Sequence, residues 1–304
     1  MHLQWTKSHS TSALHAAECL CLFAPQIQDE NLFAKLGPPA KELGICLQDL
    51  DPHGSNRLWA PLVILGSKIG SNSALANQLI SDHTVGFVEQ SLAQRLVGSI
   101  TEVEAAFKLL FPKYLEQFEY RIKPLQDQWF GYGGGFLAHL RRLTNCDSYV
   151  REASVVAVQP ILGGAGRAVA QYQSVHIEAV LTNPLPELPE VIRLGWLLSQ
   201  LVTTPLRSQS GLAPETFDRL IPIAMLAPSL ACGEVLELTK CNESVAELAI
   251  ENWNIPIPSK YAEDSGLVAT VMDWWETCLS SKPDWTVALK ALAHRLRIEP
   301  IQSV

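Results

Sequence analysis

Residues 154–202 of the 304-residue chain read SVVAVQPILGGAGRAVAQYQSVHIEAVLTNPLPELPEVIRLGWLLSQLV, and this stretch decides the fold class. Ser154–Val158 is rich in β-branched residues and Val169–Leu181 alternates apolar and polar side chains, so both segments are predicted strands. The glycines at 163–166 predict a turn, and we expect the two strands to pair as an antiparallel hairpin. After a proline-rich connector, Glu190–Val202 predicts a long apolar helix with proline at its first turn.

Helices are predicted over most of the rest of the chain, because apolar residues recur there at helical spacing. The predicted helices include 11–24, which is apolar almost throughout, and 101–118, which begins with a capping box. The glycine run 131–135 precedes another predicted helix and is interpreted as a helix–helix turn. Together with the hairpin at about 154–181, these helices predict an α+β fold that is predominantly α-helical, with a small antiparallel sheet.

A single compact domain over residues 1–304 is expected, because no stretch resembles a flexible linker. The alternative is a soft division into a helical part, 1–146, and a part with the hairpin and further helices, 150–304. Both versions leave the strands and the C-terminal helices in the same half of the chain.

The composition is typical of a soluble globular protein, with 47% hydrophobic and 18% charged residues. The net charge of −8 argues against nucleic acid and anionic membrane surfaces as partners. The 7 cysteines show no C-x-x-C spacing and are interpreted as reduced thiols. Since the sequence also shows no signal peptide and no membrane-spanning run, a cytoplasmic location is expected.

No complete catalytic, metal-binding or phosphate-binding motif is present in the sequence. The glycine run at 131–135 lacks the Gly-Lys-Ser/Thr of a phosphate loop, and H-E-x-x-H and the calcium-loop pattern are absent. We therefore expect neither a cofactor nor a metal ion.

His176 and Glu178 form the first candidate site. They alternate on the second predicted strand, so both side chains leave the same face of the sheet. Such a pair can supply two metal ligands, or a base with its orienting partner, whereas a zinc site needs three or four ligands. A hydrogen-bonded pair at the sheet edge is the interpretation that the residues favour.

Arg193 stands in an almost wholly apolar helix, and a buried arginine must be paired. A carboxylate partner is therefore predicted, and Glu190 or Glu178 could provide it. Arg142, one of two adjacent arginines, is a further candidate. The candidate ligand-binding residues are His176, Glu178, Glu190, Arg193 and Arg142.

The apolar helix contains Arg193-Leu-Gly-Trp-Leu-Leu-Ser-Gln-Leu201. In its order of hairpin, proline-rich connector and apolar helix, residues 154–202 resemble the core of zincin-type metallopeptidases, whose corresponding helix carries H-E-x-x-H. If Trp196 and Leu197 occupy the first His and Glu positions, Gln200 occupies the second His position. The resemblance therefore implies an inactive relative that lacks the metal and the base. The same helix is similar to that of bacterial proteins of unassigned function with the pattern L-P-E-V-x-R-L-x-W-L-L-x-Q-L.

Two functions follow from these residues. The favoured hypothesis is a non-catalytic binding or interaction protein, zincin-like without metal, whose partner is a protein or a small molecule. The alternative is a hydrolase or transferase that uses His176 and Glu178, with Arg193 as the anion anchor. The alternative requires these three side chains to converge on an open pocket.

Overall fold

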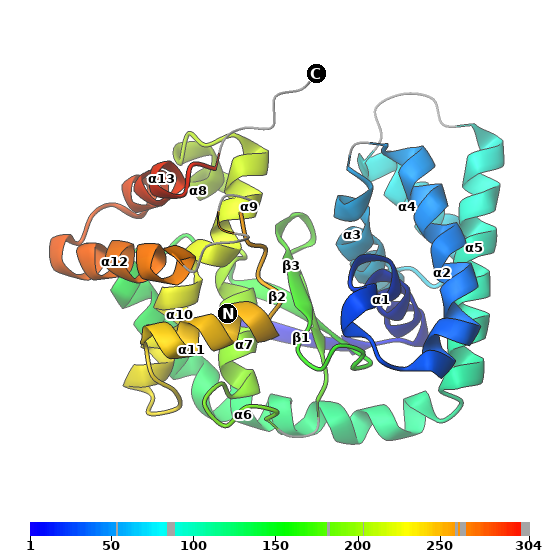
Figure 1. Ribbon diagram of the computed structural model, residues 1–304, viewed down its shortest axis with the longest axis horizontal. Coiled ribbons are helices and arrows are strands. Elements are labelled where there is room, and N and C mark those ends of the chain that lie inside the picture. Colours follow the sequence, from blue (N-terminus) through cyan, green and yellow to red (C-terminus); the bar gives the residue numbers. More distant parts are fainter. Residues whose placement is uncertain are drawn as a thin grey trace. The chain divides into compact units, whose positions relative to one another are not determined.

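The computed structural model describes residues 1–52, 54–83, 89–180, 183–202, 204–258, 261 and 266–298 (Figure 1). In these ranges the chain is mostly helical and carries a 4-stranded sheet, so the predicted predominantly helical α+β class is confirmed. None of the helices described there combines the length and the apolar character needed to cross a membrane.

The chain forms two compact units, and neither is one continuous stretch of sequence. The N-unit consists of Leu3–Ile122 and Ser154–Leu181, and the C-unit consists of Met1–His2, Lys123–Ala153 and Thr182–Val304. Residues 154–181 thus group with the N-terminal helices, whereas the soft division places them with the C-terminal ones. The single domain over 1–304 stays a prediction.

The helices of the N-unit are α1 (His9–Leu22), α2 (Glu30–Leu50), α3 (Ser55–Lys68), α4 (Asn72–His83) and α5 (Gln90–Leu110). α1 packs against α2, α3 and α5, and every residue from Thr11 to Leu20 is buried (Figure 1). Ser8 caps α1, because its hydroxyl accepts a hydrogen bond from the backbone N–H of Thr11 at 3.0 Å. A polar side chain on the buried part of α1 must therefore find its partners inside the protein.

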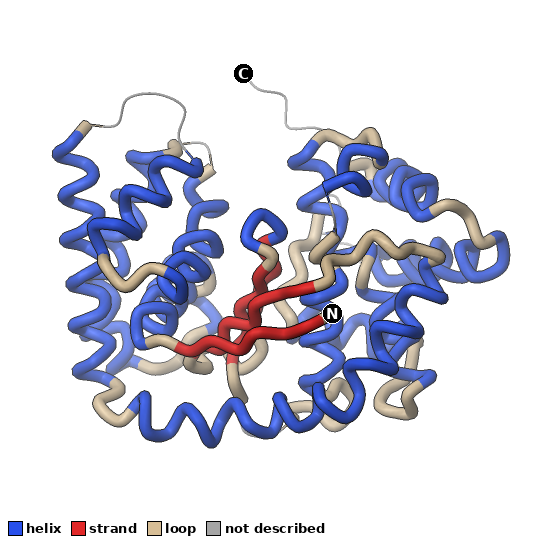
Figure 2. Tube along the Cα trace, turned by 180° about the vertical axis from the view of Figure 1, so that it is seen from behind, coloured by secondary structure: helices blue, strands red, loops and turns tan. Residues whose placement is uncertain are grey.

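The strands are β1 (His2–Lys7), β2 (Glu152–Val158), β3 (Gly166–Val169) and β4 (Ser174–Glu178). They form one sheet in the order β1-β2-β4-β3 (Figure 2). β2 pairs with β4 in parallel, with Val156 opposite His176, and β3 pairs with β4 in antiparallel register. The predicted antiparallel hairpin between 154–158 and 169–181 is therefore wrong.

The chain reverses its direction twice between β2 and β4, which explains the parallel pairing. The first reversal follows β2, and Gly163 in that loop adopts a φ of +83°. The second follows β3, at the 3-10 helix Ala170–Tyr172 and at Gln173, which adopts a left-handed φ of 47°. The predicted second strand is thus split into β3 and β4, which pair with each other.

The C-unit holds most of α6 (Tyr114–Thr144), together with α7 (Glu190–Ser199), α8 (Thr204–Gln209), α9 (Pro214–Ala224), α10 (Leu226–Val235), α11 (Glu243–Asn252), α12 (Gly266–Ser281) and α13 (Trp285–Leu296). The apolar helix predicted over 190–202 is shorter than expected, since α7 ends at Ser199, and all of its residues are buried. The turn predicted at 131–135 is wrong, because these residues lie inside α6. Glycine in a helix interior costs about 1 kcal/mol relative to alanine, an amount that tertiary packing overrides.

Candidate functional site

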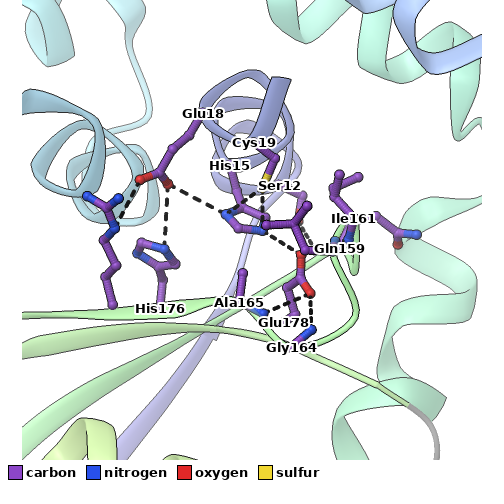
Figure 3. A network of polar contacts seen from close by, with 12 residues as sticks. Ser12, His15, Glu18, Cys19, Gln159, Ile161, Gly164, Ala165, His176 and Glu178 are labelled. Carbon is purple, nitrogen blue, oxygen red and sulfur yellow. Dashed lines mark hydrogen bonds and ion pairs between the residues drawn. The ribbon is translucent and has the colours of Figure 1, made fainter. Parts of the chain in front are cut away.

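A buried cluster of polar side chains lies between α1 and β4 in the N-unit (Figure 3). α1 contributes His15, Glu18 and Cys19, which lie on one face because residues three and four positions apart in a helix are neighbours. β4 contributes His176 and Glu178, which leave the same face of the strand. The structure therefore brings the two candidate residues of β4 together, on the face that meets α1.

The carboxylate of Glu178 accepts hydrogen bonds from four backbone N–H groups of the loop between β2 and β3. Its Oε1 accepts hydrogen bonds from the backbone N–H groups of Ile161 and Leu162 at 2.7 and 2.9 Å. Its Oε2 accepts from the N–H groups of Gly164 and Ala165 at 2.8 and 3.1 Å. The glycine turn predicted at 163–166 thus does more than reverse the chain, since two of its backbone amides bind the buried carboxylate of Glu178.

The same carboxylate also contacts His15, whose Nε2 lies 2.9 Å from Oε1 of Glu178. Burial alone raises the pKa of Glu178, but the hydrogen bonds from His15 and from the loop lower it to about 2. The group is therefore ionised at neutral pH, and Nε2 of His15 must carry the proton that it shares. With donors on both oxygens, Glu178 has little capacity left to act as a base or a metal ligand.

Glu18 is buried to the same degree but is held differently. Its Oε2 lies 3.6 Å from Nδ1 of His15 and 3.6 Å from Nε2 of His176, and its Oε1 lies 3.5 Å from Nε of Arg167. These are ion-pair distances, and neither carboxylate oxygen has a hydrogen-bond partner among the described residues. Burial raises the pKa of Glu18, while Arg167 and the two histidines bring it down to about 2.

The two histidines of the cluster differ in charge. Burial would lower the pKa of His15, but its contacts with Cys19, Glu178 and Glu18 raise it well above the usual value. Burial lowers the pKa of His176 to about 3, so this ring is neutral at pH 7. Two carboxylates thus face one imidazolium, and the guanidinium of Arg167, which is 37% exposed, balances the charge.

Cys19 completes the cluster, and its Sγ lies 3.4 Å from Nε2 of His15. A Cys–His pair can be nucleophilic when the thiol is ionised. Here burial raises the pKa of the Cys19 thiol to about 11, so the thiol is protonated at neutral pH. Its side chain is fully buried, which is typical of a cysteine that serves packing.

The other three candidate residues belong to the C-unit. Arg193 donates from Nε to Oε2 of Glu190 at 3.0 Å, and both side chains are buried. The predicted carboxylate partner of Arg193 is therefore confirmed, and it is Glu190 rather than Glu178. Arg142 lies at the end of α6, where its guanidinium contacts Nδ1 of His139 at 3.0 Å.

On α7, the side chains at the zincin-like ligand positions serve packing and helix contacts. Trp196 donates from Nε1 to the carbonyl oxygen of Pro222 at 2.8 Å, and Gln200 donates its amide to the carbonyl of Trp196 at 3.2 Å. Leu197 is fully buried. These contacts account for all three residues within the C-unit.

Sequence reasoning missed the half of the cluster that α1 supplies. His15 and Glu18 stand in a predicted helix that is otherwise almost entirely apolar. Like Arg193, both are ionisable groups in an apolar helix, and such groups need a buried partner. Their spacing of three residues, beside a His-x-Glu strand, is the signal that could have found the cluster.

The chain matches no protein-family model, and no curated protein or solved structure is significantly similar to it. The resemblance to zincin-type metallopeptidases therefore stays a prediction.

Proposed function

We propose that the protein is a non-catalytic binding or interaction protein. The observation that carries this proposal is the state of the His176–Glu178 pair. Both side chains are buried, at 1% and 0% exposure, and the Glu178 carboxylate is occupied by the loop amides and by His15. A catalytic pair needs a reacting atom of the substrate within hydrogen-bond reach, and this arrangement supports a structural role instead.

The state of Arg193 supports the same conclusion. An anion anchor must offer its guanidinium to a ligand, whereas Arg193 is 1% exposed and directs two of its nitrogens at Glu190. The alternative, a hydrolase or transferase that uses His176 and Glu178 with Arg193, loses support at each of its three residues. The apolar residues Trp196 and Leu197 at the zincin-like positions agree with a protein that lacks that chemistry.

A partner-binding surface also needs side chains that reach the solvent. Phe130 and Tyr120 on α6 are 93% and 76% exposed. Aromatic side chains are enriched at protein interfaces, because they bury much area at a low cost in conformational entropy. We expect these residues to contribute to partner binding while contributing little to folding.

The test is histidine modification by diethyl pyrocarbonate, mapped by mass spectrometry on the native full-length chain. We expect His176 and His15 to be protected and the exposed His294 to be modified rapidly. In 8 M urea, on the order of the concentration that unfolds most domains, all three should react at similar rates. Native modification of His176 as fast as that of His294 would mean that reagents reach the pair, and the non-catalytic proposal would fail.

A further inference from the structure

The carboxylate of Glu18, which has ion-pair partners but accepts no hydrogen bond from the described residues, points to a metal ion. We propose that His15, Glu18 and His176 form a binding site for a divalent transition metal ion, zinc in the first place. The three ligand atoms are Nδ1 of His15, Oε2 of Glu18 and Nε2 of His176, and they lie within 4.8 Å of one another. Two imidazoles and one carboxylate are a donor set that zinc uses in proteins.

The spacing of the atoms fits this ion. Zinc binds nitrogen and carboxylate oxygen at about 2.0–2.2 Å, so two ligand atoms of a tetrahedral site lie about 3.4 Å apart. Oε2 of Glu18 lies 3.6 Å from each imidazole nitrogen, which is too long for a hydrogen bond and close to that separation. The two imidazole nitrogens lie within 4.8 Å of each other, and side-chain rotation would bring them to the tetrahedral separation.

The hydrogen bond on the far side of His15 matches a metal-ligating histidine. Such a histidine almost always donates its other ring N–H to a carboxylate or a carbonyl, which fixes the tautomer and the orientation of the ring. His15 donates from Nε2 to Glu178, which leaves Nδ1 facing Glu18 and His176. The loop amides that hold Glu178 thus act as a support for the ring of His15.

The missing hydrogen bonds of the Glu18 carboxylate support the metal site independently. Both oxygens of Glu18 are buried and lack a hydrogen-bond partner among the described residues. Leaving such atoms unsatisfied costs about 1–3 kcal/mol each, and more for a charged group. A metal ion bound to Oε2 would satisfy the carboxylate directly. The fourth coordination position is left to a water molecule or to Oε1 of Glu18.

A second group of potential ligands, His15, Cys19 and Glu178, shares the cluster. In that group, Glu178 already accepts hydrogen bonds on both oxygens, and the thiol of Cys19 has a pKa of about 11. A metal ion there would have to displace the donors of Glu178. At the His15–Glu18–His176 group, the ion displaces only the Nδ1 proton of the His15 imidazolium, which is released to the solvent, and the hydrogen bonds of Glu178 stay intact. The two groups also differ in sulfur, which an experiment can detect.

The primary test uses the full-length wild-type chain, stripped with a chelator and titrated with zinc ions. We expect saturable uptake of about one zinc ion per chain, and a rise in melting temperature with zinc, because a ligand that binds the folded state stabilises it. X-ray absorption at the zinc edge should show a nitrogen and oxygen shell with imidazole scattering. A sulfur neighbour at about 2.3 Å, or no stoichiometric uptake, would overturn the proposal.

Variants then locate the ion. Glu18→Gln and His176→Gln should weaken zinc binding by more than about 100-fold, since the loss of an outer partner alone costs 10–100-fold. Cys19→Ala and the surface variant His294→Gln should bind zinc as the wild type does. Zinc binding that is lost in Cys19→Ala, or kept in a folded Glu18→Gln, would place the ion elsewhere. If a variant fails to fold, the absorption spectrum of the wild type still decides between the two groups.

Zinc at this site is compatible with a non-catalytic protein, because α1 and β4 enclose it. The two tests are separable. Rapid modification of His176 would end the non-catalytic proposal without affecting zinc stoichiometry, and absence of zinc uptake would leave the modification pattern unchanged.

Discussion

At the scale of single residues, Glu178 shows how one carboxylate can hold a loop, a helix and a strand together. Glu178→Gln replaces one acceptor oxygen by an NH₂ group that must face backbone donors, and it leaves the His15 imidazolium with one carboxylate fewer. We expect the free energy of unfolding to fall by about 3–5 kcal/mol, the usual cost of breaking a buried ion pair. Urea denaturation followed by circular dichroism measures this change.

Glu102→Gln on the exposed surface of α5 is the matched control and should change stability by less than about 0.5 kcal/mol. An equally small effect of Glu178→Gln would show that the loop amides and His15 do not depend on the charge.

The Arg193–Glu190 pair allows a sharper experiment, a double-mutant cycle. Glu190→Ala removes the carboxylate from a buried guanidinium and should cost about 3–5 kcal/mol. Adding Arg193→Met should recover part of that loss, because the buried charge is then gone as well. The exposed Glu187→Ala, at the start of the same helix region, serves as the control. A double variant no more stable than Glu190→Ala would contradict this account.

His9 provides a prediction of pH dependence away from the cluster. Burial lowers the pKa of His9 below 6.5, with Lys108 acting in the same direction and Glu104 against it. Since the unfolded chain takes up the proton more readily, the contribution of His9 to stability is full above pH 6.5 and is lost as the pH falls through its folded pKa. The exact loss is read from urea denaturation at several pH values.

The ring of His9 packs edge-on against Phe107 and Tyr114, so His9→Phe keeps an aromatic group in place. We expect this variant to lose less stability between pH 8 and pH 5 than the wild type does. His294→Gln, at an exposed position, should follow the wild type. If His9→Phe loses as much stability between pH 8 and pH 5 as the wild type does, the pH dependence comes from other groups.

At the scale of elements, two glycines of α6 allow the effect of helix propensity on stability to be measured apart from the effect of side-chain packing. A Cβ at Gly134 would meet no atom within 4 Å, whereas a Cβ at Gly133 would approach the ring of Trp129 to 2.4 Å. Gly134→Ala should therefore stabilise the protein by about 0.5–1 kcal/mol, because it restricts the unfolded chain and improves helix propensity. Gly133→Ala should destabilise it. Thermal unfolding compares the two variants, and equal effects would contradict the packing argument.

The strand pairing shows what a sequence pattern can and cannot specify. The β-branched residues of β2 and the alternation in β4 located both strands, since these signals are local. Their parallel register depends on Gln173, whose left-handed φ breaks the predicted second strand into two. Nothing in the alternating pattern of 169–181 marks that residue, because glutamine seldom adopts this conformation.

For a related reason, the sequence pattern indicates only the β4 half of the polar cluster. His176 and Glu178 were found because a period of two puts them on one face of a strand. Their partners lie far away in the sequence: His15 and Glu178, which are in contact, are 163 residues apart. A single sequence does not show such a long-range contact. Its only indication of the α1 half of the cluster is that His15 and Glu18 stand in an otherwise apolar predicted helix, where both are expected to be buried.

At the scale of the whole molecule, the interleaving of the two units is the feature that sequence order conceals. The predicted boundary near 146–150 is a change in local character, from helices to strands. The N-unit nevertheless crosses that boundary, because its core combines Leu14 and Leu62 with Val156 and Ala179. The extent of each unit is set by long-range packing, which composition and periodicity do not report.

This interleaving predicts the fate of a fragment cut at the soft division. A chain of residues 1–146 keeps α1 to α5 but loses β2, β3 and β4, and with them the partners of His15 and Glu18. An unpaired buried charge costs several kcal/mol, which is comparable with the 5–15 kcal/mol that stabilises a whole domain. We therefore expect the fragment to show no cooperative urea transition and to bind a dye for exposed apolar surface.

The matched control is the same fragment mixed with a synthetic peptide of residues 150–183, which carries the missing strands. The peptide should restore part of the cooperative transition, because it returns Glu178 and the apolar side chains of β2 to α1. A peptide in which Glu178 is replaced by Gln should restore less. A fragment 1–146 that unfolds cooperatively on its own would instead mean that the helices are self-sufficient, and that the sheet and its polar cluster are held by the N-unit without stabilising it.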